Sequence, residues 1–525
     1  MWHHLINILL HLVNVFLVYR FCYFIFKENN KALFCAILFC FHPFQIETIA
    51  WVSAKNNLVY SLFFLSGLLC YTRYLTTTLK KYFSLTLVFF VLSLLSKPSA
   101  ITFPICLFLL EFLTNKRIDA RSFTIRIAPF LLLSVIVGII TLYTRSEANF
   151  LNTHNNFALH EKIGYAGFAL VFYLSKFILP INLSVIYPYP ENGLLSIGIG
   201  YAFLILLCFG LYKLYKQQKF ILIFGVLFFI ANLVLVLQLI PFGETLTADR
   251  YMYLPIIGLS IGLVYFINIS SYKSQLIILT LIVFSLGFLS FKRTSVWQNS
   301  ISLYTDILKK YPNSYEALNG LGAEYMLKKD YNKASLFLNK AIAQSSNYYK
   351  PFYNRGLLYA RNRDFEKAIA DFTKAIELKK YNKAYTARAA AYFELNEIDK
   401  AISDAEMALK NNTTNGNTYY VLANCYNQQN ELDKALAHYN KAIEYASEDG
   451  EIYLKRAILF GKKQNFSACI TDLNSAIYYN PNASEAYYWR GVAKFNINQN
   501  PCSDLLKAKK LGYSMAEKAI NSYCR

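Results

Sequence analysis

Acidic side chains are scarce in the first 300 residues of this 525-residue chain, where nine Asp and Glu stand against 22 Lys and Arg. The ten cysteines include no CxxC pair, so no zinc or thioredoxin-like site is predicted. The absence of P-loop, GxGxxG and HExxH motifs argues against a nucleotide-driven pump. These 300 residues are instead rich in apolar runs, and charge becomes dense only beyond "SFKRTSVWQNS", which predicts a domain boundary after residue 293.

Ten apolar stretches approach the length that crosses about 30 Å of hydrocarbon. They predict a polytopic membrane domain over residues 1–293 with about ten transmembrane helices, near 4–26, 32–50, 57–75, 82–96, 98–113, 127–143, 194–212, 220–240, 251–269 and 274–291. Lys and Arg cluster at the ends of these runs, where the positive-inside rule puts them. The net charge of +21 therefore indicates loops beside a lipid bilayer and not a nucleic-acid partner.

The basic loops at 27–31, 73–81, 116–126 and 213–219 are predicted to face the cytoplasm, which leaves 41–57, 96–98, 144–162 and 241–250 on the outer side. Residues 162–180 would break this alternation, so we expect an interfacial or re-entrant helix there. Met1 then lies outside although "MWHHLIN" is no signal peptide, and we expect a first transmembrane helix to precede this sequence. The second domain is predicted in the periplasm of a bacterium, beyond the inner membrane, or in the ER lumen of a eukaryote.

Residues 294–525 repeat with a period of 34. Small residues recur in step at Gly322, Gly356, Ala389, Ala423, Ala457 and Gly491, and a second set at Ala341, Ala375, Ala408, Ala442, Ala476 and Ala508. The pattern resembles the tetratricopeptide repeat (TPR) and predicts an α-solenoid of about six repeats, with a leading half repeat and a terminal capping helix. The whole chain is thus predicted to be all-α.

Such a solenoid presents a concave surface that usually holds a peptide or a protein. Most Tyr and Phe residues at the period are expected in the core. Residues off that register on the first helices are the candidates for protein binding: Tyr353, Asn354, Tyr420, Asn424, Tyr488 and Arg490. Cys502 and Cys524 bracket the last helical pair and predict either a disulfide in an oxidising compartment or two free thiols.

Ionisable residues gather on the predicted outer face of the membrane domain, where they are suspected of function. They are His42, Glu47, Lys55, Lys97, Arg145, Glu147, His154, His160, Glu244, Asp249 and Arg250. Carboxylates, cations and aromatic residues at a lipid interface suit a substrate with a lipid tail and a phosphate. Each residue also has a plainer interpretation, as a loop charge in water or, for Trp51, Tyr251 and Tyr253, as an interface anchor.

In that site a Lys or Arg would hold the phosphate, and a carboxylate would deprotonate an acceptor hydroxyl. We assign the catalytic candidates to Glu47, His42 and Asp249, and the substrate-binding candidates to Lys55, Lys97, Arg250, Tyr251 and Tyr253. His3, His4 and His11 have no carboxylate near them in sequence, and no metal site is assigned.

Several stretches, taken in order, resemble the transmembrane and tetratricopeptide-repeat (TMTC-type) protein O-mannosyltransferases and their bacterial relatives. They are "HLINILLHLVNVFLVYR", "FHPFQIETIAWVSAKNNLVYSLFFL", "SKPSAITFPICLFLLE", "ILPINLSVIYP", "TADRYMYLPIIGLSIGL" and "VWQNSISLYTDILKKYPNS". The resemblance implies a GT-C fold and a glycosyltransferase that moves a sugar from a polyprenyl-phosphate carrier to a protein hydroxyl on the outer face. It also implies that the TPR domain presents the acceptor.

Enzymes of the GT-C superfamily carry an acidic pair in their first outer loop, upstream of the region where this sequence begins. Two alternatives follow: a truncated chain, or a homologue without catalysis that serves as a membrane-anchored TPR scaffold. A transporter or flippase is less favoured because few charges lie at mid-membrane depth. Under the resemblance, Glu47 positions the acceptor or a divalent metal, and Arg250 or Lys97 holds the carrier phosphate.

Overall fold

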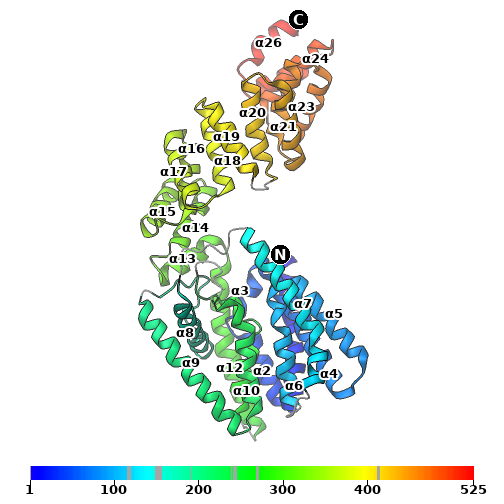
Figure 1. The fold of residues 1–525 in the computed structure, drawn as a ribbon. Coiled ribbons are helices and arrows are strands. Elements are labelled where there is room, and N and C mark those ends of the chain that lie inside the picture. Colours follow the sequence, from blue (N-terminus) through cyan, green and yellow to red (C-terminus); the bar gives the residue numbers. More distant parts are fainter. Residues whose placement is uncertain are drawn as a thin grey trace. The chain divides into compact units, whose positions relative to one another are not determined.

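Two compact units, residues 1–317 and 318–525, make up the computed structural model (Figure 1). The structure describes residues 2–114, 120–147, 157–190, 192–237, 239, 245–267, 271–410 and 414–524; the side chains at 120–122, 145–147 and 272 also lie outside the described set. The described backbone is helical apart from turns and one isolated antiparallel bridge between Tyr187 and Thr247. The predicted all-α class is confirmed.

The first unit is a bundle of apolar helices joined by short turns. Its α-helices are α1 (Trp2–Phe26), α2 (Asn29–Phe41), α3 (Gln45–Ala50), α4 (Lys55–Thr77), α5 (Lys80–Ser96), α6 (Phe103–Thr114), α7 (Ala120–Glu147), α8 (Leu159–Ile178), α9 (Gly193–Lys216), α10 (Phe220–Leu233), α11 (Ile256–Tyr265), α12 (Tyr272–Thr294) and α13 (Ser300–Lys310). Its 3-10 turns are η1 (Val52–Ala54), η2 (Pro98–Thr102), η3 (Val234–Val236), η4 (Asp249–Met252) and η5 (Ser295–Trp297).

Five described helical segments are long and apolar enough to cross a bilayer by length and composition: Trp2–Phe26, Val52–Thr77, Phe123–Thr144, Gly193–Lys216 and Lys273–Trp297. Shorter apolar helices cover Asn29–Phe41, Pro98–Thr114, Phe220–Val236 and Ile256–Tyr265. Helix α8, over the predicted interfacial segment, is not in either set. Large apolar side chains such as Leu132, Leu194, Phe284 and Phe291 are exposed on the outer faces of these helices, the reverse of the pattern that water favours.

Glycines let neighbouring apolar helices pack backbone to backbone. A Cβ atom at Gly200 of α9 would collide with the carbonyl oxygen of Gly164 in α8, and one at Gly167 would collide with the backbone of Gly200. Gly225 of α10 and Gly258 of α11 make the same kind of approach. Helices α8 and α9 accordingly lie side by side (Figure 1), in the small-residue packing that apolar helices use.

The two compact units meet at Ala317, further along the chain than the boundary expected after residue 293. The reason is that α13 belongs to the first unit. Arg293 at the end of α12 donates to Asp306 of α13 over 2.7 Å, and Lys310 donates to the same carboxylate and to the carbonyl oxygen of Leu183, both over 2.6 Å. The sequence pattern predicts that α13 is a leading half repeat of the solenoid. Its polar partners, Arg293 and Leu183, instead belong to the first unit.

The second unit is a run of helical hairpins. The paired helices are α14 (Tyr315–Leu327) with α15 (Tyr331–Gln344), α16 (Tyr349–Arg361) with α17 (Phe365–Leu378), α18 (Asn382–Glu394) with α19 (Ile398–Lys410), α20 (Gly416–Gln428) with α21 (Leu432–Tyr445), α22 (Gly450–Lys462) with α23 (Phe466–Tyr479), and α24 (Ser484–Asn496) with α25 (Cys502–Lys510), followed by α26 (Ala516–Tyr523). The periodic small residues sit inside the hairpins: Gly356 faces the ring of Phe372, and Ala389 is fully buried.

Each hairpin turns through one residue in the left-handed conformation. These residues are Lys329, Arg363, Asn396, Asn430, Gln464 and Asn498, and their spacing follows the repeat. The next residue caps the second helix in several hairpins; the carboxylate of Asp364, for example, accepts from the backbone N–H of Lys367. Local turn chemistry and hydrophobic period therefore agree at every repeat, which is how a sequence specifies a solenoid.

Four hairpins share an internal arginine fork. Arg456 donates through Nε and Nη2 to both carboxylate oxygens of Asp472 and through Nη1 to Asn440, each over 2.7 Å. The same fork joins Arg355 to Asp371, Arg388 to Asp404 and Arg490 to Asp504. In the fourth hairpin the equivalent positions hold Leu422 and His438, and the His438 ring stacks on Tyr426 at 5.3 Å between centroids.

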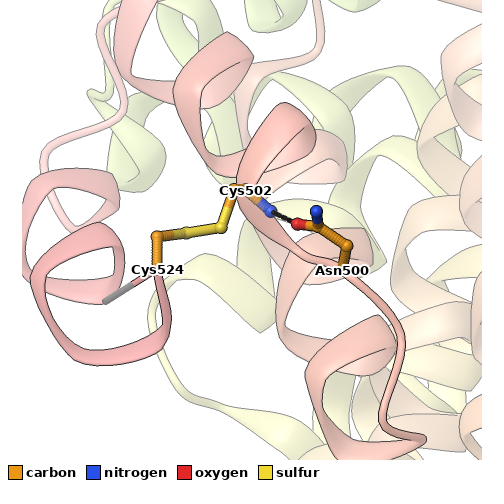
Figure 2. The surroundings of a disulfide bond; sticks show 3 residues. All are labelled: Asn500, Cys502 and Cys524. Atoms are coloured by element: carbon orange, nitrogen blue, oxygen red, sulfur yellow. Dashed lines mark hydrogen bonds between the residues drawn. A yellow bond between two sulfur atoms is a disulfide. The ribbon is translucent and has the colours of Figure 1, made fainter.

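A disulfide joins Cys502 and Cys524, with 5.6 Å between their Cα atoms. Figure 2 shows the bond linking the start of α25 to the residue that follows α26, beside Asn500, whose side-chain oxygen accepts from the Cys502 N–H. Of the two alternatives that the sequence left open, the structure contains the bridged form.

Candidate functional site

Two segments far apart in the sequence, α3 and η4, meet in the first unit and fix one arginine. Glu47 of α3 accepts from Nη1 of Arg250 over 2.7 Å and from the backbone N–H of Arg250 over 3.0 Å. Each carboxylate oxygen therefore has its own donor from the same residue. The Glu47 carboxylate is buried, whereas 25% of the Arg250 side chain stays exposed, so a carboxylate out of water sets both the backbone and the side chain of Arg250.

Aromatic rings flank the guanidinium that Glu47 orients. The Arg250 guanidinium lies 5.5 Å from the Trp51 ring centroid and 4.9 Å from that of Tyr251. A planar, delocalised cation between aromatic faces keeps its charge while its remaining N–H groups stay directed. Arg250 is thus a prearranged cation at the wall of a cavity.

Lys97, between α5 and η2, supplies a second cation to the same cavity. Its Nζ donates to Oδ1 of Asn57 over 2.6 Å and lies 5.9 Å from the ring centroids of Tyr60 and Tyr251. Tyr251 therefore stands beside both Lys97 and Arg250. Sequence reasoning predicted these three residues together, and the structure brings them together.

The cavity they share has a volume of about 600 Å³ and a divided character. Its polar lining comes mainly from the start of α4, from Lys97 and from η4, among them Asn57, Lys97 and Arg250, and a small pocket of about 20 Å³ with Ser61 and Asn232 adjoins it. Its apolar lining comes mainly from η2, α7 and the segment from η3 onward, with Ile101, Gly138, Leu142, Val234, Leu235, Val236 and Leu239, and Thr141 of α7 adds a hydroxyl. Among the described residues that line the cavity none is an Asp or a Glu.

Asp249 lies next to this site without lining it. Its Oδ1 accepts from the Tyr187 hydroxyl over 2.7 Å, and the side chain is almost wholly buried. Burial, followed by the charge of Glu47, raises the pKa of Asp249 to about 8. Near neutral pH this carboxyl is therefore largely protonated and holds its loop through Tyr187.

His42 is committed to the backbone. Its Nδ1 accepts from the N–H of Phe44 over 3.2 Å, which leaves the proton on Nε2 to donate to the carbonyl oxygen of Phe177 over 3.1 Å. Burial lowers the pKa of His42 to about 4, so the ring is neutral. Both ring nitrogens are therefore engaged in hydrogen bonds, and His42 links the end of α2 to the start of α3 and the end of α8.

The other two substrate-binding candidates lie off the cavity or deep beside it. Lys55 points toward α1, where its Nζ is 3.3 Å from Nδ1 of His3. Tyr253 is buried at the small pocket, and its hydroxyl meets Nδ1 of His11 at 2.8 Å and accepts from Asn14 over 3.2 Å. The side chains of Arg145, Glu147, His154 and Glu244 lie outside the described residues.

No three His, Cys, Asp or Glu side chains in the described parts of the chain gather as a metal site would. Glu47, the carboxylate that the resemblance offered to a metal, has both oxygens occupied by Arg250. Glu47, in this arrangement, does not fit the role of a metal ligand. Sequence reasoning missed Asn57, which orients Lys97, and Tyr187, which holds Asp249; neither belongs to a motif that announces its partner.

The protein-binding candidates divide in two. Tyr420 and Asn424 line a groove of about 650 Å³ in the second unit, together with Ala387, Ala390 and Glu394 of the preceding hairpin. The remaining four take part in internal packing: Tyr353 against Tyr381, Asn354 bonded to Asn319, Tyr488 against Tyr513 and Arg490 in its fork with Asp504.

Comparisons with known proteins place tetratricopeptide repeats in the chain. The model of that family matches residues 349–382 and 416–449. The solved TPR protein YrrB is 21% identical with a TM-score of 0.30, over 35% of this chain and 97% of that one.

Three curated relatives show how local the sequence matches are. Human serine/threonine-protein phosphatase 5 is 36% identical over 18% of this chain and 19% of its own length. Human protein O-mannosyl-transferase TMTC3 is 33% identical over 14% and 8%, and the UDP-N-acetylglucosamine–peptide N-acetylglucosaminyltransferase of Giardia intestinalis is 30% identical over 26% and 10%. The chain spans about a fifth of the length of the first relatives it matches.

Proposed function

We propose that this protein is a membrane glycosyltransferase that takes a sugar from a polyprenyl-phosphate carrier and passes it to a protein hydroxyl. The observation that carries the proposal is the cavity of the first unit, in which Arg250 and Lys97 stand at one part and an apolar wall forms the other. A lipid-linked sugar phosphate has the matching division, with an anionic head, a polar sugar and a long hydrocarbon tail. The partial matches to two protein glycosyltransferases agree with this class of reaction.

The chemistry asked of the site is stabilisation of a leaving phosphate. Transfer breaks the bond between the sugar's anomeric carbon and a phosphate oxygen, and it forms a bond from that carbon to the acceptor oxygen. The departing polyprenyl phosphate gains negative charge, which the cations of Arg250 and Lys97 oppose. Because Glu47 prearranges Arg250, little reorganisation is needed when that charge develops.

Glu47 has a positioning role in this proposal and is not the base. Both of its oxygens hold Arg250, and it does not line the cavity. The acceptor's proton must leave to another group, and the described cavity wall carries no carboxylate to receive it. A base for the hydroxyl therefore has to come from outside the described lining.

Binding of decaprenyl phosphate to the purified full chain in detergent tests the proposal, with native mass spectrometry as the readout. Lys97→Met keeps the length of the side chain and removes the charge, and it should weaken binding by roughly tenfold because one charge-assisted hydrogen bond to the phosphate is lost. Lys55→Met, which removes a lysine that points toward His3, should leave the affinity within about twofold. Equal effects of the two substitutions, or no binding at all, would overturn the proposal.

We place the first unit in a lipid bilayer and the second on the outer side, in a bacterial periplasm or an ER lumen. Exposed apolar helix faces support the first statement. The Cys502–Cys524 disulfide supports the second, because such bonds persist in oxidising compartments. In cells, a maleimide should label Cys502 and Cys524 only after a reductant is added; labelling of both without reductant contradicts the outer location.

The second unit is proposed to hold the acceptor or a partner protein in the groove that Tyr420 and Asn424 line. Asn424→Ala together with Tyr420→Ala should reduce glycosylation of a protein acceptor while leaving decaprenyl phosphate binding unchanged. Loss of both readouts would indicate misfolding and not acceptor binding.

A non-catalytic membrane-anchored TPR scaffold is the second candidate function, and one observation favours it. The described lining of the cavity includes the cations Arg250 and Lys97, and the adjacent Glu47 has both oxygens on Arg250, an arrangement suited to holding an anionic ligand. The scaffold predicts a chain that binds decaprenyl phosphate or a protein partner yet releases no polyprenyl phosphate from a decaprenyl-phosphate sugar. Measured turnover on that donor excludes it.

A further inference from the structure

Gly138, in the middle of α7, differs from the packing glycines of the first unit. At Gly167, Gly200, Gly225 and Gly258 an added Cβ would meet a neighbouring backbone atom at less than 3 Å. At Gly138 it would meet nothing within 4 Å. Close helix packing therefore gives no reason for a glycine here, although glycine in a helix interior lowers helix stability relative to alanine.

Position 138 lies where an absent side chain adds volume to the cavity. Three other described helical glycines also face open space, Gly198, Gly210 and Gly262, but of these four only Gly138 lines the cavity. Thr141 and Leu142 follow at i+3 and i+4 and line it too, so one face of α7 forms the wall. Val234, Leu235, Val236 and Leu239 add further apolar side chains to the lining.

The two parts of the cavity differ in chemistry. Arg250 and Lys97 define the polar part, and the wall between α7 and η3 offers hydrocarbon contacts. An amphiphile whose anion lies beside Arg250 is matched at its other end by this apolar wall. Leu142 and Leu239 of this wall keep 42% and 37% of their surface accessible, so the apolar lining of the cavity reaches the surface of the first unit at these two residues.

We propose that the lipid tail of the donor passes over the surface of α7 at Gly138, where no side chain blocks it. This glycine would then determine specificity for long-chain lipid phosphates. The inference rests on the proposed function, because it takes the head group to lie at Arg250 and Lys97. A leucine at position 138 would project into the path of the tail, while it would meet no neighbouring atom within 4 Å of its Cβ in the empty protein.

Decaprenyl phosphate titrated into the full chain in detergent measures the effect. Gly138→Leu should weaken binding by roughly tenfold or more, since a buried site filled by extra methylenes tolerates a ligand poorly. Gly210→Leu is the matched control: this glycine also faces open space, on α9, but does not line the cavity, and its affinity should stay within about twofold. An affinity of Gly138→Leu within threefold of the unchanged chain overturns the inference.

A second variant keeps the test decisive if Gly138→Leu fails to fold. The thiol introduced by Gly138→Cys should react with a maleimide more slowly when decaprenyl phosphate is saturating, as read by peptide mass spectrometry at that position. An unchanged rate contradicts the inference. The two proposals fail separately: if Lys97→Met weakens binding and both substitutions at Gly138 are silent, only the lipid path is wrong, whereas if Lys97→Met is silent the proposed function is wrong.

Discussion

The two units use the same pair of functional groups, a guanidinium and a carboxylate, for different ends. In the second unit Arg456 gives Nε and Nη2 to Asp472 and Nη1 to Asn440, so its donors point inward to neighbouring helices. In the first unit Arg250 gives Nη1 and its backbone N–H to Glu47, and the guanidinium lies between aromatic rings at a cavity. Arg456 stabilises the packing of its helices, whereas Arg250 is fixed by Glu47 with its guanidinium at the cavity.

The difference teaches how to tell a structural arginine from a binding one. Repetition identifies the first kind: four hairpins carry the same fork, in which the arginine pairs with an Asp of its own hairpin and donates through Nη1 to a residue of the preceding one. A single occurrence, with the carboxylate buried on one side and a cavity on the other, identifies the second kind. Counting ion pairs would not have separated them, because the distances are alike.

Breaking the pair in the first unit should have the largest effect. Arg250→Ala leaves the Glu47 carboxylate buried without its partner, which we expect to cost about 3–5 kcal/mol of stability. Thermal unfolding of the full chain in detergent measures it. The double substitution Arg250→Ala with Glu47→Gln should recover part of the loss, since the buried charge is gone; an unchanged melting temperature for Arg250→Ala would contradict the buried-pair account.

The same substitution in the second unit should cost less. Arg456→Ala leaves the Asp472 carboxylate without its partner, but that side chain keeps 6% of its surface exposed against 1% for Glu47, so water can solvate it in part. We expect a loss of about 1–2 kcal/mol, detected as faster hydrogen exchange in α22 and α23. The fourth hairpin supplies a natural alternative at these positions, Leu422 with His438. Arg456→Leu with Asp472→His should therefore be better tolerated than Arg456→Ala, and a double variant that exchanges faster than the single one argues against equivalence.

Asp249 adds a third kind of carboxyl group to the comparison. Its Oδ1 accepts a hydrogen bond from the Tyr187 hydroxyl, whereas Glu47 and Asp472 accept from guanidinium groups. Its folded pKa of about 8 lies above the ordinary value, so the folded state binds the proton more tightly than the unfolded chain. Stability from this group is present at low pH and is lost as the pH rises from about 4 toward 8. Asp249→Asn should flatten this slope.

The measurement is the melting temperature of the full chain between pH 5 and pH 9. Relative to Asp249→Asn, the melting temperature of the unchanged chain should fall by several degrees across that range, because its folded state holds this proton more tightly than the unfolded chain does. Parallel curves for the two proteins would show that Asp249 does not titrate there.

Much of the fold was accessible to sequence reasoning because period and packing are local. The small residue at each 34-residue step predicted the hairpins, since each one faces a side chain of the next helix, as Gly356 faces Phe372. The boundary was harder: α13 has helical character typical of a repeat, but its ion pairs with Arg293 and its bond to Leu183 assign it to the first unit.

Two of the three predicted cations of the site, Arg250 and Lys97, line the cavity, whereas the third, Lys55, points toward His3. Arg250, Lys97 and Tyr251 fall on one side of a predicted membrane domain, and the structure assembles them. Glu47 was predicted as catalytic, yet its partner lies 203 residues away and no local pattern reveals that both oxygens are occupied. Arg490 falls at the repeat position of Arg456, but its partner Asp504 lies 14 residues later and not 16 as in the three other forks, so the spacing alone does not identify this fork.

The disulfide at the end of the array bears on where unfolding begins. A row of hairpins held only by nearest neighbours tends to fray from its ends, because a terminal hairpin has a neighbour on one side alone. The bond from Cys502 to Cys524 ties α26 back to the start of α25. While the bond is intact α26 stays tied to α25, and a reductant would leave α26 held by its packing contacts alone.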